Sequence, residues 1–134
     1  MILTSAVVTS LIVNIHLYAT NNQLNNELVL ARTYLPLLVI SNQSSAVREY
    51  LKQHPSAQWS VMKLYVGSNG SVYTVDDSWE LQRYVGGTHE PEDGKSHYCW
   101  RVHFYYRTYI MIEHIINVFI DKDSWEIVLV EEDW

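Results

Sequence analysis

The C-terminal part of the chain is dominated by side chains that alternate between two faces, and this two-residue period constrains the fold more than any other feature. In its clearest stretch, Trp100, Val102 and Phe104 alternate with Arg101 and His103. A period of two is typical of a β-strand with one buried and one exposed face. We therefore expect Trp100, Val102 and Phe104 to be buried, and Arg101 and His103 to be exposed.

A strand–turn–strand pattern occurs twice in this region. Val72–Leu81 and Val118–Ile127 share the sequence Asp-Ser-Trp-Glu followed by Leu or Ile, and each copy follows a Trp-x-Val strand. The turn residues Asp77 and Asp123 can accept hydrogen bonds from backbone N–H groups two positions on. The tryptophan of each copy is expected to begin the outgoing strand and to cover apolar surface. Each copy predicts a three-strand meander, and two meanders paired edge to edge predict an antiparallel sheet of five or six strands.

The start of the chain is apolar, with no charged side chain before Glu27. The apolar run of residues 1–20 is about as long as a helix that crosses a bilayer. Three interpretations remain open: a membrane anchor, a cleaved signal peptide, and an apolar helix buried in the fold. We favour the anchor, because no basic residue precedes the run as one would in a signal peptide.

The orientation of such an anchor is weakly specified. Asn42-Gln43-Ser44 and Asn69-Gly70-Ser71 are possible glycosylation sequons, which favours an extracytoplasmic sheet domain. Arg32 and Arg48 follow the apolar run and favour the opposite orientation. We expect a membrane-anchored protein whose sheet domain is extracytoplasmic.

Two helices are expected between the apolar run and the sheet. Residues 23–35 place leucine and alanine at three- and four-residue spacing, and Pro36 should end this helix. Ser44 or Ser45 can cap a short second helix that ends before Pro55, and its apolar face should pack on the sheet. The predicted α+β organisation is an anchor or signal segment at 1–20, a helical connector at 21–43, and an antiparallel-sheet domain at 44–134.

The segment from about His97 to Glu131 resembles a PepSY-type module. The matching residues are Trp100-Arg101-Val102, Asn117-Val118-Phe119-Ile120-Asp121 and, after a turn, Glu126-Ile127-Val128. The turn departs from the family pattern, which has a small residue and Gly where this chain has Ser124-Trp125. The resemblance implies a cystatin-like α+β fold, an extracytoplasmic or membrane-tethered setting, and a regulatory or inhibitory binding role without catalysis.

The composition argues against several classes of function. Nine Lys and Arg against fifteen Asp and Glu give a net charge of -6, which repels a nucleic-acid backbone. Cys99 is the single cysteine, so an intramolecular disulfide cannot form, and its aromatic neighbours favour a buried, inert thiol. We predict no catalytic residues and no cofactor.

The leading candidate site is the polar side of one strand, formed by Arg101, His103, Tyr105 and Arg107. Tyr and Arg are enriched where protein interfaces gain their binding energy. We therefore expect a non-catalytic, membrane-anchored module that binds or regulates another protein, such as an accessory subunit of a membrane complex.

The alternative is a metal site in the loop and strand at residues 88–103. His89, Glu92, His97, Cys99 and His103 carry the imidazole, carboxylate and thiolate groups that zinc or copper prefers, though without the usual ligand spacing. This set predicts a small extracytoplasmic metal-binding protein.

Overall fold

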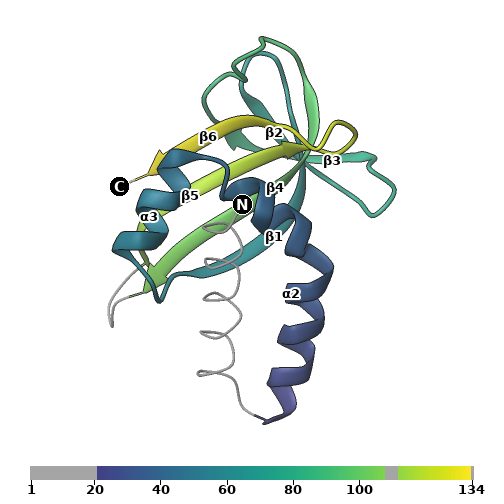
Figure 1. The fold of residues 1–134 in the computed structure, drawn as a ribbon. Helices are drawn as coiled ribbons and strands as arrows, with labels where there is room; N and C mark the ends of the chain where they lie inside the picture. Colours follow the sequence, from purple (N-terminus) through teal and green to yellow (C-terminus); the bar gives the residue numbers. More distant parts are fainter. Residues whose placement is uncertain (1–20, 108–111, 134) are drawn as a thin grey trace. The chain divides into compact units, whose positions relative to one another are not determined.

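The computed structural model of the chain describes residues 21–107 and 112–133. Residues 1–20, which the sequence predicts as a membrane anchor, lie outside this part. The chain divides into two compact units, a helical unit that ends at Ala57 and a sheet that begins at Gln58 (Figure 1). Helices and an antiparallel sheet together make an α+β fold, as the sequence predicts.

Helix α2 (Asn21–Ser41) continues through Pro36, so the prediction that this proline ends the helix was wrong. A proline inside a helix removes one N–H donor and crowds the preceding turn, at a cost of about 3 kcal/mol. The next turn offsets this cost, because Leu37 and Leu38 are almost completely buried. Two buried leucines contribute roughly 3–6 kcal/mol. The hydroxyl of Ser41 also donates a 2.7 Å hydrogen bond to the carbonyl of Leu37.

Helix α3 (Ser45–Gln53) is the expected second helix. Its buried residues Val47, Tyr50 and Leu51 follow helical spacing. Ser44 occupies the N-cap position, but its side chain makes no capping hydrogen bond, so the predicted cap was wrong in this detail. The packing of α3 on the sheet stays a prediction.

In the described part of the second unit, six strands form one antiparallel sheet in the order β3-β2-β1-β4-β5-β6 (Figure 1). Strands β1–β2–β3 make one meander, β4–β5–β6 make the other, and the β1–β4 pair joins them. The edge-to-edge pairing of two meanders is therefore confirmed. The strands are β1 (Gln58–Val66), β2 (Ser71–Val75), β3 (Leu81–Gly87), β4 (His97–Arg107), β5 (Ile112–Asp121) and β6 (Ile127–Asp133).

Both faces of the central strands carry buried side chains, whereas the alternation predicts one dry and one wet face. Val102 and Phe104 are completely buried, as predicted, but Trp100 is only half-buried. On the opposite face, Cys99 and Phe119 belong to an apolar core at one end of the sheet. This core consists of Leu64, Val66, Val72, Cys99, Phe119 and Leu129.

The loop between β3 and β4 connects strands that are far apart in the sheet. The N–H of Thr88 donates a 2.8 Å hydrogen bond to the carbonyl of Gly70, in the turn just before β2. The N–H of Glu92 donates a 3.3 Å hydrogen bond to the carbonyl of Val128, on β6. The loop is therefore fixed both near β2 and on β6, at the end of the sheet where the face that was expected to be wet carries the buried apolar core.

The tryptophans of the two repeated turns share a left-handed backbone conformation. Trp79 and Trp125 have φ angles of 64° and 60°, and each lies just before the outgoing strand. Asp76 Oδ1 accepts hydrogen bonds from the N–H groups of Ser78 and Glu80. Asp121 Oδ1 plays the same part in the second turn, which is one residue longer.

Two details of the predicted repeat were wrong. The accepting carboxylates belong to Asp76 and Asp121 and not to Asp77 and Asp123, because the aspartate that opens each turn lies one residue before Asp77 and two residues before Asp123. Trp125 is 44% exposed and does not cover the core. It lies beside the edge strand β6, where no further strand can cover it.

Candidate functional site

The predicted binding residues lie on one face of the central strands. Arg101 and His103 alternate with Val102 along β4 and therefore point to the same side of the sheet. His103 is in register with Asn117 on β5, and Asn117 is in register with Glu131 on β6. We call this group, Arg101, His103, Asn117 and Glu131, the polar face.

Arg101 is half-buried, although the alternation predicts that it is exposed. Its Nε atom is buried without a hydrogen-bond acceptor among the described residues, and its Nη2 atom lies 3.8 Å from the sulfur of Met62. Burial lowers the pKa of Arg101, and the negative charge of Glu131 partly offsets this effect. An arginine guanidinium nevertheless stays charged. In the described chain, its hydrogen-bond partner is the sulfur of Met62.

His103 is also half-buried and is held by a neighbouring strand. Its Nδ1 atom lies 2.7 Å from Oδ1 of Asn117, which fixes the ring orientation and places the proton on Nδ1. Burial lowers the pKa of His103 more than this bond raises it, and the positive charge of Arg101 lowers it further. A neutral His103 leaves the lone pair of Nε2 for a donor from outside the chain.

Tyr105 and Arg107 continue the line of side chains toward the end of β4. The ring of Tyr105 lies 5.1 Å from the ring of His103, and the guanidinium carbon of Arg107 lies 5.8 Å from the centre of the Tyr105 ring. The structure therefore brings the four predicted residues together along one strand, with cations at both ends and aromatic rings between them.

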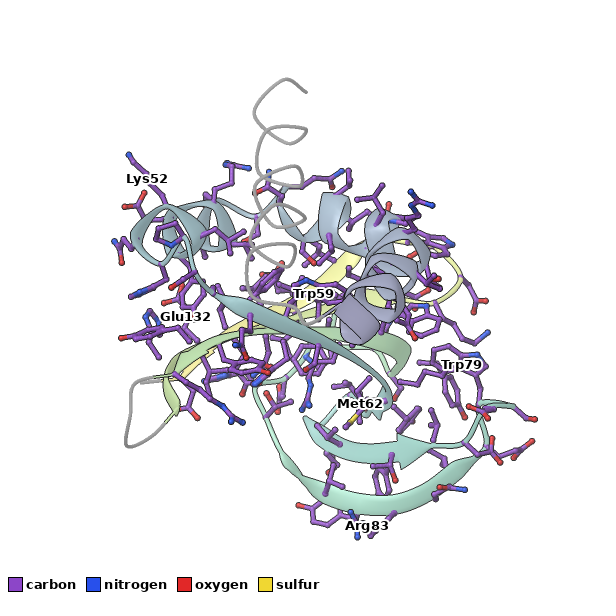
Figure 2. All side chains as sticks on the ribbon, turned by 90° about the horizontal axis from the view of Figure 1, so that it is seen from below. Lys52, Trp59, Met62, Trp79, Arg83 and Glu132 are labelled. Carbon is purple, nitrogen blue, oxygen red and sulfur yellow. The ribbon has the colours of Figure 1, made fainter. Side chains whose placement is uncertain are left out.

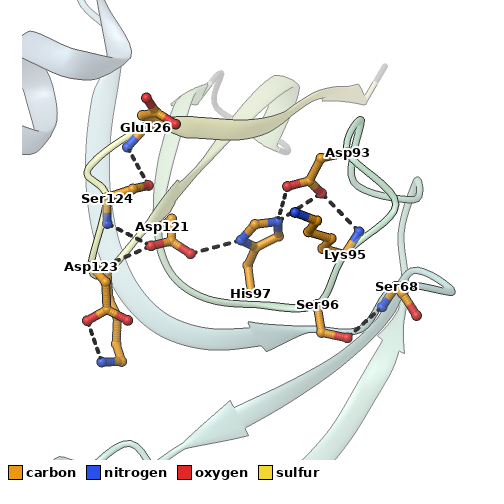
Figure 3. Close-up of polar contacts among 10 residues, drawn as sticks. Ser68, Asp93, Lys95, Ser96, His97, Asp121, Asp123, Ser124 and Glu126 are labelled. Atoms are coloured by element: carbon orange, nitrogen blue, oxygen red, sulfur yellow. Dashed lines mark hydrogen bonds and ion pairs between the residues drawn. The ribbon is translucent and has the colours of Figure 1, made fainter.

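His97 connects the β3–β4 loop to the second repeated turn (Figure 3). Its Nε2 atom lies 2.8 Å from Oδ2 of Asp93 in the loop, and its Nδ1 atom lies 2.8 Å from Oδ2 of Asp121 at the end of β5. Burial by itself would lower the pKa of His97, but the two carboxylates outweigh it and raise this pKa. We call Asp93, His97 and Asp121 the histidine clamp.

The clamp also lowers the pKa of both carboxyl groups. Burial opposes ionisation of Asp121, but the backbone N–H groups of Ser124 and Asp123 and the ring of His97 lower its pKa to about 2. The bond to His97 is the main cause of the lowered pKa of Asp93. The three side chains therefore form a charged cluster that joins the β3–β4 loop to the end of β5.

The candidate metal ligands do not come together. His97 is engaged in the clamp, His103 bonds to Asn117, and His89 is a surface residue that lies 3.4 Å from a carboxylate oxygen of Glu131. Across residues 21–107 and 112–133, no group of three or more His, Cys, Asp and Glu side chains is arranged to hold a metal ion.

Cys99 is fully buried in the apolar core. Burial, together with the negative charges of Asp121 and Asp93, raises the pKa of its thiol to about 12. The thiol therefore stays protonated at neutral pH and is neither a nucleophile nor a ready metal ligand.

A second surface, on the opposite face of the sheet, is formed by aromatic rings from four strands and one turn. Tyr84 contacts Tyr73, Tyr73 contacts Tyr65, and Tyr65 contacts Tyr98, with ring centres 4.9–6.1 Å apart. Trp79 then lies 6.4 Å from Tyr98 and 5.2 Å from Trp100. We call these six residues the aromatic surface: Tyr65, Tyr73, Trp79, Tyr84, Tyr98 and Trp100.

Two lysines hold the tryptophans of the aromatic surface. The ammonium of Lys63 lies 5.1 Å from the Trp79 ring and 5.2 Å from the Trp100 ring. The ammonium of Lys122, from the second repeated turn, lies 5.6 Å from the Trp79 ring. Cation–π contacts of this kind contribute about 0.5–1 kcal/mol each at exposed sites.

Reasoning from the sequence missed the aromatic surface. Its residues come from both meanders, and only the β1–β4 register places Tyr65 beside Tyr98 and Lys63 beside Trp100. The high content of ten tyrosines and five tryptophans was the one signal that could have indicated it.

No protein-family model matches the sequence, and searches of curated proteins and of solved structures gave no match either. The resemblance to PepSY-type modules therefore stays a prediction. Neither α2 nor α3 is long and apolar enough to cross a bilayer.

Proposed function

We propose that the chain is a non-catalytic module that binds another protein through its aromatic surface, and that residues 1–20 anchor it to a membrane with the sheet outside the cytoplasm. The observation that carries this proposal is the row of six contacting, partly exposed rings across β3, β2, β1 and β4. Tyrosine and tryptophan are typical of the residues that dominate binding energy at protein interfaces.

The edge of the sheet supports the same proposal. Strand β3 is the last strand of the described sheet on its side, so one row of its backbone N–H and C=O groups has no strand partner there. Leu81 and Val85 are 50% and 45% exposed, and Tyr84 is 57% exposed. Figure 2 shows Arg83 projecting outward from this strand and Trp79 at the turn that precedes it. An extended segment of the partner can pair with this edge and place its side chains on the aromatic rings.

A photo-crosslinking amino acid at position 84 tests the proposal in the intact membrane. The matched control places the same amino acid at Tyr105, which lies on the opposite face of the sheet. We expect one defined partner to crosslink at position 84 and not at position 105. Crosslinking at position 105 alone would assign the interface to the polar face.

The affinity of the identified partner provides the quantitative test. In the full chain, Tyr84→Ala should weaken binding by roughly tenfold or more, as expected for an exposed tyrosine that the partner covers. Tyr105→Ala should leave the affinity nearly unchanged. Equal effects of the two substitutions would contradict a role for the aromatic surface.

A further inference from the structure

Arg101 is the least satisfied charged side chain of the polar face. A guanidinium offers five N–H donors, yet in the described chain Arg101 forms no ion pair and its single hydrogen-bond partner is the sulfur of Met62. Removing a charge from water is costly unless a partner replaces the lost hydration, so the buried part of this guanidinium favours an anionic ligand.

The nearest carboxylate does not provide this partner. The charge of Glu131 acts on Arg101 through space, but its carboxylate lies 3.4 Å from Nδ1 of His89 and forms no ion pair with Arg101. The contact with Met62 is open to solvent, and the side chain of Met62 is itself exposed, so the terminal amino groups of Arg101 can be reached from outside.

His103 offers a second, complementary group on the same face. Because its Nδ1 atom donates to Asn117, its Nε2 atom can only accept a hydrogen bond while the ring is neutral. Residues two apart on a strand are separated by about 7 Å. One ligand can therefore place an anionic group on Arg101 and an N–H donor on His103.

We propose that Arg101 and His103 form a binding site for a carboxylate that has an amide N–H close by, as an acidic residue of a peptide does. The carboxylate accepts two parallel hydrogen bonds from the Arg101 guanidinium, the geometry that arginine favours. The amide N–H donates to Nε2 of His103. Small free carboxylates share the first of these contacts and lack the second.

The site is independent of the proposed protein-binding surface. Arg101 and Tyr84 lie on opposite faces of the sheet, so Tyr84→Ala leaves the carboxylate site intact. If carboxylates do not bind, only the Arg101 site is refuted. If position 84 crosslinks to no partner, only the proposed function of the aromatic surface is refuted.

Residue-resolved NMR titration of the full chain in detergent micelles at pH 7 tests the site. The probes are a blocked tetraglutamate peptide, the matching tetraglutamine peptide, and succinate. We expect tetraglutamate to shift the backbone amide signals of Met62, Arg101 and His103, and tetraglutamine to leave them in place. Succinate should shift these signals less than tetraglutamate does, because it has no amide N–H for His103, and an equal effect of succinate would contradict the proposed contact with His103.

Substitutions decide whether Arg101 is responsible. Arg101→Gln should weaken tetraglutamate binding by about tenfold or more. Arg83→Gln removes the same charge from an exposed position on β3 and should change binding by no more than about twofold. Arg101→Lys keeps the charge without the two-pronged geometry and should give an intermediate affinity. The proposal is wrong if both peptides bind alike, if neither binds, or if Arg101→Gln and Arg83→Gln have equal effects.

Discussion

The histidine clamp makes a strong prediction about stability and pH. His97→Gln removes the two bonds to Asp93 and Asp121, which are 2.8 Å long and involve charged groups. The fall of the Asp121 pKa from 3.8 to about 2 corresponds to roughly 2.4 kcal/mol of folding free energy. Solvent screening and the share of the backbone N–H bonds reduce the part due to His97, so His97→Gln should cost about 1–2 kcal/mol at pH 6.

The pH dependence follows from the direction of each pKa. The pKa of His97 is raised in the folded chain, so its contribution is complete below the unfolded value of 6.5 and is lost as the pH rises through the folded value. The pKa of Asp121 is lowered, so its contribution is complete above 3.8 and is lost as the pH falls toward about 2. The clamp therefore stabilises the fold most between about pH 4 and 6.5.

Urea denaturation followed by tryptophan fluorescence measures this contribution. The matched control is His89→Gln, because the side chain of His89 is 78% exposed. The difference between wild type and His97→Gln should shrink from pH 6 to pH 9, while His89→Gln should change stability by less than about 0.5 kcal/mol. A difference that stays constant across this range, or equal effects of both substitutions, would refute the reasoning.

Three further predictions concern the core and the turns of the sheet. Gly70→Ala should cost about 2–3 kcal/mol, because its φ is +82° and a Cβ would lie 2.5 Å from a backbone oxygen, whereas Gly94→Ala, at φ +66° with open space around it, should cost about 1 kcal/mol. Phe119→Ala should cost about 3–5 kcal/mol by leaving a cavity, and Arg83→Ala less than about 0.5 kcal/mol, both measured by urea denaturation. Cys99, with its pKa raised to about 12, should react with a thiol reagent only after unfolding, and fast labelling of the native chain would contradict its burial.

The two meanders could be predicted from the sequence because their signals are local, whereas the pairing of β1 with β4 that joins them could not. Alternation identified β4, and turn residues identified the hairpin from β1 to β2 and the reversal after Asp121. The exact acceptor in each turn could not be predicted, because the two turns differ by one residue and Asp76 lies next to a second aspartate. The helix α2 ran past Pro36 because burial after the proline outweighed a local preference.

The sites were harder to predict because they depend on contacts between distant segments. The four residues of β4 were found together since a single strand carries them. The partial burial of Arg101 depends on its neighbours across strands, and the clamp depends on a loop that reads as a solvated connection. The aromatic surface needs the register between the two meanders, which no local pattern specifies.

Covalent footprinting of tyrosine side chains in the wild-type chain, with and without the partner that crosslinking identifies, tests the central claim most directly. Tyr84 is 57% exposed in the free chain and should be modified readily. The partner should protect Tyr84 and Tyr73 from modification and leave Tyr105, on the opposite face, unchanged. Unchanged modification of Tyr84, or protection confined to Tyr105, would contradict binding through the aromatic surface.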